Sequence, residues 1–315
     1  AKGWRMIKER IILDTDPGID DALALLLLAA SPEIKIEAIT TTHGNSTVEN
    51  CTKNALQLLE LAKIDIPVAR GAAEPLIKDL TIAAETHGDN GLGNAHLPAT
   101  QKSALTQHAS DLICEIINAN PGEITILAIG PLTNIALAIH RSPQIVNKVK
   151  RIITMAGAIH FPGNASPDSE YNVFCDPEAF DIVLRSKIPL TVVPLDVTYK
   201  CLFTTEHLKK ISTRNVKIKE FIEKATAFYM DFHHEYQNIQ GCAVNDPLAA
   251  ALLIKPDLVE LFNYFMTVEL NGKYTRAKTS VDYFQIYKES PNVQVAMRVD
   301  VEEFMNFFIE RINRL

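Results

Sequence analysis

The sequence predicts an α/β fold in which helices cover both faces of a largely parallel central sheet. Short β-rich runs alternate with helical patterns through most of the chain, which is typical of strands joined by crossover helices. Polar residues recur directly after several of these runs, where parallel sheets place their ligand sites. No internal repeat and no Pro/Ser-rich linker divides the chain, so we expect one domain over residues 1–315.

The predicted strands and helices follow one another in a regular order. The first strand is the apolar run from Ile11 to the Pro17-Gly18 turn, and residues 22–30 continue as a helix. Further strands are expected at Ile34–Thr41, 67–69, 124–129, 149–155 and 190–195. Further helices are expected at Val48–Ala62, 104–119, 133–139 and Pro177–Arg185. Right-handed crossovers between these strands would give a Rossmann-like sheet.

The last third of the chain departs from this alternation. Residues 205–254 look mostly helical, and residues 258–300 are rich in strand-forming residues. Residues 302–314 have the spacing of an amphipathic helix. We therefore expect a strand-rich C-terminal extension of the sheet, in part antiparallel.

Composition excludes several classes of function. The net charge of −7 and the lack of a Lys/Arg block argue against nucleic acid or an anionic membrane as a partner. The longest apolar stretch, 22–30, is too short to cross a bilayer, and residues 1–5 show no secretory signal. The five cysteines are scattered without a C-x-x-C pair, which favours the reducing cytoplasm over a disulfide framework or a zinc site.

Four carboxylates cluster where the first strand gives way to the first helix. Asp14, Asp16, Asp20 and Asp21 stand within eight residues. Carboxylates this close repel one another unless a cation or shared protons relieve the repulsion. The cluster therefore predicts a site for a hard metal ion.

Other interpretations of this cluster are weaker or remain open. Asp20 alone could be a helix N-cap. An EF-hand loop starting at Asp14 would need Gly and Glu where the chain has Ile19 and Leu25, so it is excluded. A phosphatase of the haloacid-dehalogenase type also opens with a strand and D-x-D, and it would use Asp14 as its nucleophile with Mg²⁺.

Polar sequences also follow other predicted strands. Thr-His-Gly-Asn occupies 42–45, Gly-Pro-Leu-Thr-Asn occupies 130–134, and a long loop after 155 reaches Asn164 and the segment 170–172. Because the carboxyl ends of parallel strands meet at one edge, these residues and the four acids would build one acidic, amide-rich pocket.

Some of these residues also have purely structural interpretations. Asn134 stands beside a helix start and is expected to be a turn or capping residue. Asp176, before Pro177, is expected to be a helix N-cap. Glu170 and Asn172 alternate, so on a strand-like segment they would face the same side.

The motifs as a set resemble the nucleoside hydrolases, which cleave the N-glycosidic bond of inosine, uridine and related nucleosides. The resemblance covers nearly the whole chain, and its most specific part is DTDPGIDD at 14–21. The other matches are Gly44-Asn45, HGDNG at 87–91, GPLTN at 130–134, Asn164, EYN at 170–172, DPEA at 176–179 and Asp246-Pro247. A dehalogenase-type phosphatase would not be expected to share these later motifs.

The resemblance implies a role for each matching position. Asp16 would be the general base that activates water, and His87 would border the nucleobase. A Ca²⁺ ion would be held by Asp16, Asp21, Asp246 and the backbone carbonyl near Ile129. The ribose hydroxyls would be bound by Asp20, Asn45, Asn164, Glu170 and Asn172.

The chemistry of the reaction agrees with these residue types. Cleavage places oxocarbenium-like positive charge on the sugar, which a carboxylate-rich pocket stabilises. Direct attack by water predicts inversion at C1′. A 2′-deoxynucleoside would lack one hydroxyl ligand for the metal, so we expect it to be a poor substrate.

One position departs from the family pattern. Many of these enzymes have a His before the last metal-binding Asp, where it protonates the leaving base, but this chain has Asn245. An amide cannot transfer a proton at neutral pH. Tyr229, His233 and Gln237 are spaced four apart and would project from one helical face. His233 is the first candidate for the missing acid and His87 the second, and Gln237 favours a pyrimidine base without excluding purines.

The sequence alone leaves three functions in view. The first is a Ca²⁺-dependent ribonucleoside hydrolase of pyrimidine or broad specificity. The second is the Mg²⁺-dependent phosphatase, and the third is a nucleoside-binding protein that Asn245 weakens in catalysis. The resemblance also implies a cytoplasmic homodimer or homotetramer in nucleoside salvage.

Overall fold

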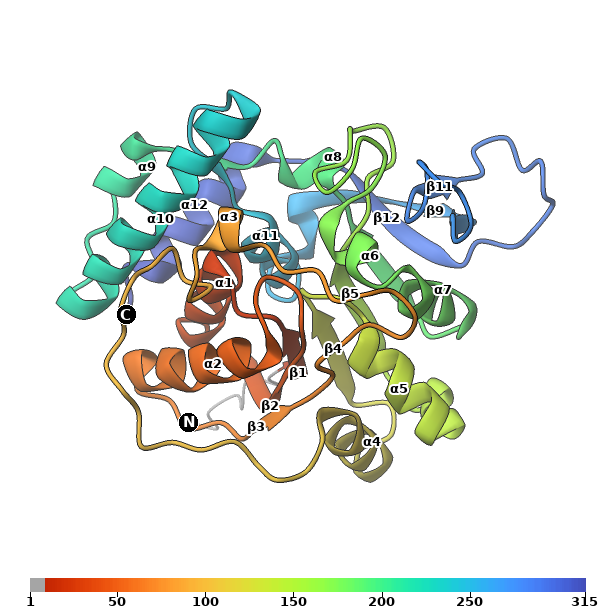
Figure 1. Cartoon of the computed structure of the whole chain (residues 1–315), viewed down its shortest axis with the longest axis horizontal. Coiled ribbons are helices and arrows are strands. Elements are labelled where there is room, and N and C mark those ends of the chain that lie inside the picture. Colours follow the sequence, from red (N-terminus) through yellow and green to blue (C-terminus); the bar gives the residue numbers. More distant parts are fainter. Residues whose placement is uncertain (1–8) are drawn as a thin grey trace, which may run out of the picture.

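The central sheet has eight strands in the order β3–β2–β1–β4–β5–β6–β12–β9 (Figure 1). The computed structural model describes residues 9–315, so the expectation that residues 1–5 carry no secretory signal lies outside the described residues. The strands are β1 (Glu9–Thr15), β2 (Ile34–Thr41), β3 (Val68–Arg70), β4 (Ile124–Ala128), β5 (Arg151–Met155), β6 (Leu190–Val193), β9 (Val259–Tyr264) and β12 (Val293–Val299). The predicted α/β fold is confirmed.

The strand order sets the position of the site. β1 pairs in parallel with both β2 and β4. From β1 the chain first adds β2 and β3 on one side of the sheet, and it then adds β4, β5 and β6 on the other side. Every neighbouring pair of this sheet is parallel except β9 with β12. Ligands bind such sheets at the carboxyl ends of the strands, where the order reverses, which here is between β1 and β4.

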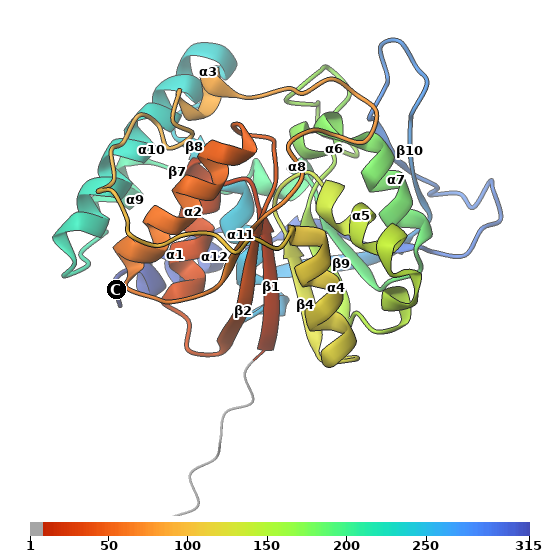
Figure 2. The same cartoon turned by 60° about the horizontal axis from the view of Figure 1, so that its bottom comes forward.

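Helices cover both faces of the sheet because side chains alternate along its strands. Ile11 and Leu13 of β1 belong to one core cluster, whereas Ile12 belongs to another. The first face is covered by α1 (Ile19–Ala29), α2 (Val48–Ala62), α10 (Val216–Gln237), α11 (Asn245–Ala251) and α12 (Val301–Ile312). The second is covered by α4 (Ala109–Ala119), α5 (Thr133–Arg141) and α7 (Pro177–Arg185), as Figure 2 shows.

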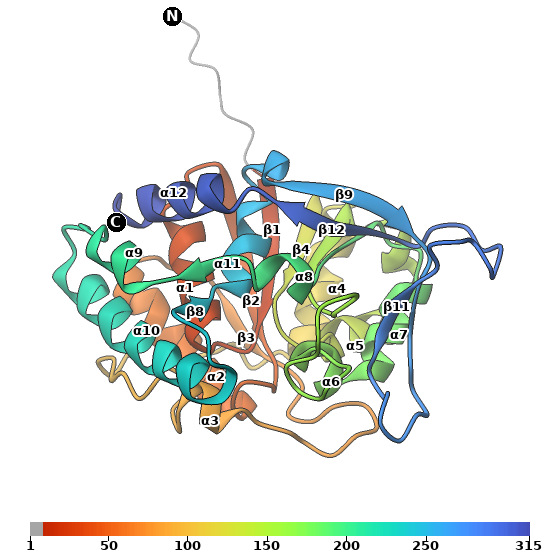
Figure 3. The same ribbon diagram turned by 90° about the horizontal axis from the view of Figure 1, so that it is seen from above.

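The C-terminal part adds strands, as expected, but not all of them are antiparallel. β12 joins the main sheet in parallel with β6, and β9 then pairs antiparallel with β12. β10 (Met266–Val268) and β11 (Thr279–Val281) form a separate antiparallel pair that projects to one side (Figure 3). Residues 205–254 are mostly helical, as predicted, with α9 (Thr205–Lys209) before α10.

Several segments begin or end at other residues than predicted, and two of these shifts have clear local causes. α4 starts at Ala109 rather than at 104, because Leu105 bridges to Ala69 at the sheet edge and the His108 ring accepts from Ser110 N at 3.2 Å as the cap. β6 ends at Val193, because Pro194 opens the short helix α8 (Leu195–Thr198). No helix within 9–315 combines the length and the apolar character that crossing a membrane requires.

Candidate active site

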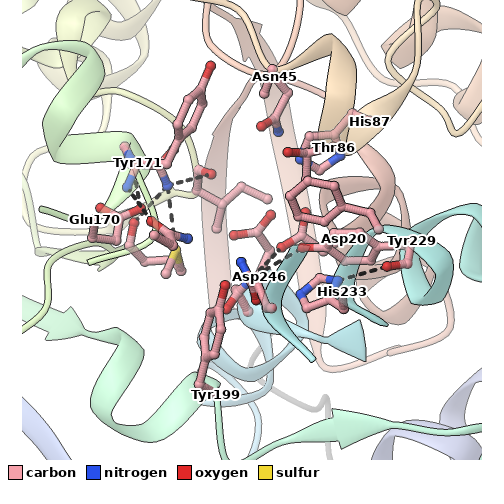
Figure 4. Close-up of a pocket in the computed structure, with 18 residues that line it drawn as sticks. Asp20, Asn45, Thr86, His87, Glu170, Tyr171, Tyr199, Tyr229, His233 and Asp246 are labelled. Atoms are coloured by element: carbon pink, nitrogen blue, oxygen red, sulfur yellow. Dashed lines mark hydrogen bonds between the residues drawn. The ribbon is translucent and has the colours of Figure 1, made fainter. Parts of the chain in front are cut away.

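A pocket opens at the carboxyl-end edge of the sheet, around the switch point between β1 and β4 (Figure 4). This inner pocket is lined by Asp20, Asn45, Ala83, Thr86, His87, Ile129, Met155, Asn164, Glu170, Tyr171, Asn172, Tyr199, Tyr229, Phe232, His233, Gln237, Asn245 and Asp246. Every residue assigned to the site from the sequence is in this lining except Asp16 and Asp21. Those two adjoin it, because both accept hydrogen bonds from Asn45.

Three carboxylates form the core of an acid floor, which we define as Asp16, Asp20, Asp21 and Asp246. Asp20, Asp21 and Asp246 each present an oxygen within 4.8 Å of the others. Asp20 and Asp21 lie in the first turn of α1, and Asp246 lies in the first turn of α11, where helix dipoles favour negative charge. Burial, followed by the charge of Asp21, raises the pKa of Asp20 to about 7.

The Asp16 side chain packs against Gly44 and Gly130, where any side chain would clash with its carboxylate. A side chain at Gly44 would meet Asp16 Oδ2 at 2.1 Å, and one at Gly130 would meet Oδ1 at 2.6 Å. Gly44 also has a φ of +149°, which L side chains rarely adopt. Asn45 N donates to Oδ2 at 2.7 Å, whereas Oδ1 is buried without a partner. Burial and the charge of Asp21 raise the pKa of Asp16 well above its usual range.

Asp14 has a different environment two residues earlier on the same strand. Its Oδ2 accepts from Thr40 Oγ1 at 2.6 Å and from Asn134 Nδ2 at 2.8 Å, and it is absent from the pocket lining. Burial raises its pKa to about 7. The phosphatase alternative therefore lacks a nucleophile that faces the pocket.

Asn134 is not the turn or capping residue that the sequence suggested. Its side chain is fully buried, with Oδ1 accepting from Ala72 N at 2.9 Å and Nδ2 donating to Thr41 O at 2.9 Å. It therefore joins β1, β2 and the loop after β3, because a buried amide satisfies backbone groups that water cannot reach.

Asp176 is the N-cap of α7, as predicted, since its Oδ1 accepts from Ala179 N at 3.0 Å. Its Oδ2 also accepts from Thr133 Oγ1 at 2.6 Å, and Thr133 in turn pairs with His43 Nε2 at 2.9 Å. Burial lowers the pKa of His43 to about 4, so this ring is neutral. The network braces the loop that carries Gly44 and Asn45.

Glu170 and Asn172 are not on a strand-like segment, so that expectation was wrong. They belong to α6 (Tyr171–Cys175), with Glu170 as its N-cap. Glu170 accepts from Asn172 N at 2.7 Å, from Val173 N at 3.1 Å and from Gly157 N at 3.0 Å. Burial outweighs these bonds and raises its pKa to about 7. Both side chains still line the pocket.

The polar side chains around α6 hydrogen-bond mostly to backbone groups of the protein. Asn172 Nδ2 donates to Met155 O at 3.0 Å and to Ile129 O at 3.2 Å. Asn164 Oδ1 accepts from Tyr171 N at 2.9 Å. These bonds hold the strand ends β4 and β5 and the long loop in one rigid rim.

The face of α10 predicted from the sequence lines the opposite side of the pocket. Tyr229 and His233 are buried, and their rings meet edge to face with centroids 4.4 Å apart. His233 Nδ1 pairs with Tyr229 O at 2.8 Å, and its Nε2 accepts from Ala243 N at 3.4 Å. Burial lowers the pKa of His233, so the ring is neutral.

His87 and Asn245 complete this side. His87 ends α3 (Ala84–His87), and its Nδ1 accepts from Ile19 N at 3.0 Å. Burial lowers its pKa to about 3. Asn245 Nδ2 donates to Asp20 Oδ2 at 3.1 Å and to the Tyr229 hydroxyl at 3.3 Å, whereas its Oδ1 is buried without a partner.

The acid floor fits a metal ion. Among the described residues that line the inner pocket, none is Lys or Arg, so no protein cation neutralises these carboxylates. Asp16 Oδ1 is a buried charge-bearing atom without a partner. Clustered carboxylate oxygens and backbone carbonyls are the ligands that hard divalent cations prefer.

Sequence reasoning missed several residues of the lining. They are mostly apolar or aromatic side chains, namely Ala83, Thr86, Met155, Tyr171, Tyr199 and Phe232. Tyr171 was inside a quoted motif, and Phe232 is next to His233. Tyr199 follows a predicted strand, which was the only signal that could have found it.

The chain belongs to the family described as inosine-uridine preferring nucleoside hydrolases, which it matches over residues 11–306. It is 36% identical over 304 residues to the pyrimidine-specific ribonucleoside hydrolase RihA of Citrobacter koseri, covering 96% of this chain and 97% of the relative. RihA of Salmonella typhimurium gives the same identity and coverage. The protein is therefore an N-glycosyl hydrolase that converts ribonucleosides to free base and ribose.

Solved structures agree with this assignment. A plant nucleoside hydrolase, PpNRh1, superposes with a TM-score of 0.92 at 33% identity, covering 97% of this chain and 99% of that one. A purine-preferring ribonucleoside hydrolase from Gardnerella vaginalis gives 0.90 at 33% identity, covering 96% and 98%. The family is metal-dependent, and the acid floor is where this chain offers a metal site.

Proposed function

We propose that this enzyme hydrolyses pyrimidine ribonucleosides, or a broad set of ribonucleosides, with water activated by Asp16 and a bound Ca²⁺ ion. The observation that carries the proposal is the acid floor, in which oxygens of Asp20, Asp21 and Asp246 lie close together and Asp16 Oδ1 is buried without a partner. Asp16, Asp21, Asp246 and the carbonyl of Ile129 would hold the ion. When bound, Ca²⁺ would supply positive charge that favours the ionisation of a coordinated water and orients the two vicinal ribose hydroxyls.

Asp16 is the general base of this proposal. Its Oδ1 accepts one proton from water while the water oxygen bonds to C1′ and the bond from C1′ to the base nitrogen breaks. Asn45 N fixes Oδ2 at 2.7 Å, which leaves Oδ1 as the acceptor. Asp20, Asn45, Asn164, Glu170 and Asn172 hold the ribose hydroxyls, and the negative charge of the floor stabilises the developing oxocarbenium ion.

Among the candidate groups for the leaving base, His87 is favoured over His233. His233 engages both ring nitrogens with backbone groups of Tyr229 and Ala243. His87 accepts at Nδ1 from Ile19 N, so its hydrogen lies on Nε2 and is available to the pocket. Because its pKa is near 3, His87 donates a hydrogen bond to the departing base, which leaves with the electron pair of the broken bond and is then protonated by water. Asn245 holds the Tyr229 hydroxyl and Asp20 together.

The base preference rests on Gln237 and on the relatives. Gln237 lines the pocket beyond His233, where its amide can pair with the edge of a pyrimidine. The RihA relatives carry a pyrimidine-specific name, whereas the Gardnerella enzyme carries a purine-preferring one. The preference of this chain is therefore a pyrimidine with tolerance of purines.

Product release from uridine, cytidine, inosine and adenosine tests the proposal, with Ca²⁺ present and after chelation. We expect metal-dependent release of free base and ribose, fastest from uridine or cytidine. Tight nucleoside binding without turnover would overturn the proposal and support a binding protein. Release that is unaffected by chelation would overturn the metal's part in it.

We also propose a cytoplasmic homodimer or homotetramer that acts in nucleoside salvage. The five free cysteines fit a reducing compartment. Beyond β11, Phe284, Ile286 and Tyr287 are 87%, 73% and 67% exposed, which suits a surface that another copy covers. Light scattering at micromolar concentration would give the mass, and a monomer would overturn the assembly.

A further inference from the structure

A second hollow lies directly outside the inner pocket. We define this outer hollow by its rim residues Ile82, Phe161, Phe174 and Tyr236, which do not line the inner pocket. It shares Tyr199, Phe232 and Gln237, among others, with the inner pocket. The two hollows are therefore neighbours that share part of their walls.

A row of aromatic rings runs along one side of both hollows. From inside to outside, the aromatic row is His87, Tyr229, His233, Tyr199 and Phe161, with successive centroid distances of 5.5, 4.4, 6.1 and 4.9 Å. Figure 4 shows Tyr199, His233 and Tyr229 following one another around the pocket. Distances in this range suit stacked or edge-to-face rings, so the row offers repeated surfaces to planar groups.

The rim of the outer hollow exposes apolar side chains to solvent. Phe161, Ile82 and Tyr236 are 38%, 46% and 60% exposed, and Tyr236 stacks on Phe232 with centroids 5.0 Å apart. Gathered exposed aromatics at the mouth of a ligand pocket are typical of a binding surface. The hollow is thus built for contact with an apolar group.

The charge of the outer hollow narrows the class of ligand. Among the described residues that line it, none is Lys, Arg or His, and Glu85 is acidic. Lys78 Nζ lies 3.1 Å from the centroid of the Phe174 ring at the rim, but it is engaged there with the ring and with Phe174 O. The lining itself therefore offers a phosphate group no cationic side chain, which disfavours nucleotides and dinucleotides. A neutral apolar or aromatic group remains.

The junction between the two hollows carries a polar group that fits a linking amine. Gln237 lines both hollows, and its Oε1 is buried without a partner. If the ribose lies at the acid floor, a base that extends from it toward α10 would bring its far edge to Gln237, which lines both hollows. A secondary amine on that edge would donate its N–H to Oε1 and direct its substituent outward.

We propose that the outer hollow is a subsite for a neutral aromatic substituent on the exocyclic nitrogen of the nucleobase. This inference rests on the proposed function, because it requires the ribose to lie at the acid floor. The enzyme then hydrolyses N-substituted ribonucleosides at least as efficiently as the unsubstituted parents. Phe161 and Tyr236 determine this selectivity, since they contact the substituent and not the reacting atoms.

The test compares N4-benzylcytidine with cytidine and N6-benzyladenosine with adenosine by kcat/KM. The Ca²⁺-loaded wild type is compared with Phe161→Ala and Tyr236→Ala, and Tyr274→Ala, an exposed tyrosine elsewhere, is the control. We expect a substituted-to-parent ratio of about 1 or more in the wild type. Each hollow variant should lower the ratio about fivefold to tenfold, the worth of one aromatic contact, with the parent rate unchanged.

Three results would overturn the inference. One is a wild-type ratio below about 0.1, because a tenfold loss means that the substituent is excluded. Another is an equal change of parent and substituted rates in both variants. A third is an altered oligomeric mass with an unchanged ratio, which would assign the rim to contact between copies. Failure of cytidine and adenosine themselves to react would instead overturn the proposed function.

Discussion

The acid floor and the aromatic row face the same pocket, but they are built from different parts of the chain. The floor sits on the ends of rigid elements, with Asp16 just after β1 and Asp246 in the first turn of α11. The row sits on α10, on the short helix α3 and on loops such as the one with Phe161. In the proposed function, the reacting groups therefore lie at strand ends and helix starts, whereas the groups that would contact the base lie on a helix and on loops, which tolerate substitution better.

The largest effect should distinguish Asp16, which follows β1, from Asp14, which lies within β1. Asp16→Asn should lower kcat for uridine by about a thousandfold or more, because the base that takes the proton of water is lost. Asp14→Asn should lower the free energy of unfolding, because Oδ2 accepts two hydrogen bonds and Oδ1 is buried without a partner, so the new NH2 group would have no acceptor at either position. It should cost much less in kcat. Steady-state kinetics and urea denaturation of both variants check this. An equal loss of kcat in the two variants would break the distinction.

The second effect lies on the aromatic row. His87→Ala should lower kcat for uridine about a hundredfold, in the range expected when a hydrogen-bond donor to developing negative charge is removed. The loss should nearly vanish with p-nitrophenyl riboside, whose leaving group needs no assistance. His233→Ala serves as the matched comparison, and a larger loss there than at His87 would reverse the assignment.

Metal removal should change how stability depends on pH. Burial raises the pKa of Asp20 and of Glu170 to about 7, so the folded metal-free protein binds more protons than the unfolded chain at pH 5. The free energy of unfolding should therefore fall as pH rises from about 5 to 8. A metal at 100 times its Kd should restore about 2.7 kcal/mol. Denaturation curves with and without Ca²⁺ measure both effects, and a metal-free protein that gains stability over this range would contradict them.

The smallest effect concerns Asn245, which stands where many members of the family have His. Asn245→His should raise kcat for inosine and adenosine by about tenfold, because imidazole can transfer a proton to a poor leaving group. Asn245→Gln, which keeps an amide, is the control and should give no gain. A gain shared by p-nitrophenyl riboside would show that the substitution acts on something other than leaving-group activation.

The contrast between the acid floor and the aromatic row also explains what the sequence could predict. The strands and the acids were predictable because apolar runs and D-x-D spacing are local patterns that end at a shared sheet edge. Glu170 and Asn172 were placed on the wrong element, because a two-residue alternation does not distinguish a strand from the start of a short helix. Asn134 was misassigned because its partners, Asp14 and Ala72, are distant in sequence.

The aromatic side was harder to predict for the same physical reason. Tyr229, His233 and Gln237 share the helical spacing of α10, so their common face was visible. Tyr199 and Phe161 lie in or beside loops, where an aromatic residue has no periodic signal. Only the packing of those loops against α10 brings the rings into one row.

The configuration of the first-formed ribose tests the central claim most directly. If water activated by Asp16 attacks C1′ from the face opposite the base, proton NMR during hydrolysis of uridine should first detect α-ribose, the inverted anomer, before mutarotation. Initial β-ribose would require a covalent intermediate or attack from the same face, and it would contradict the account in which Asp16 activates water for direct displacement.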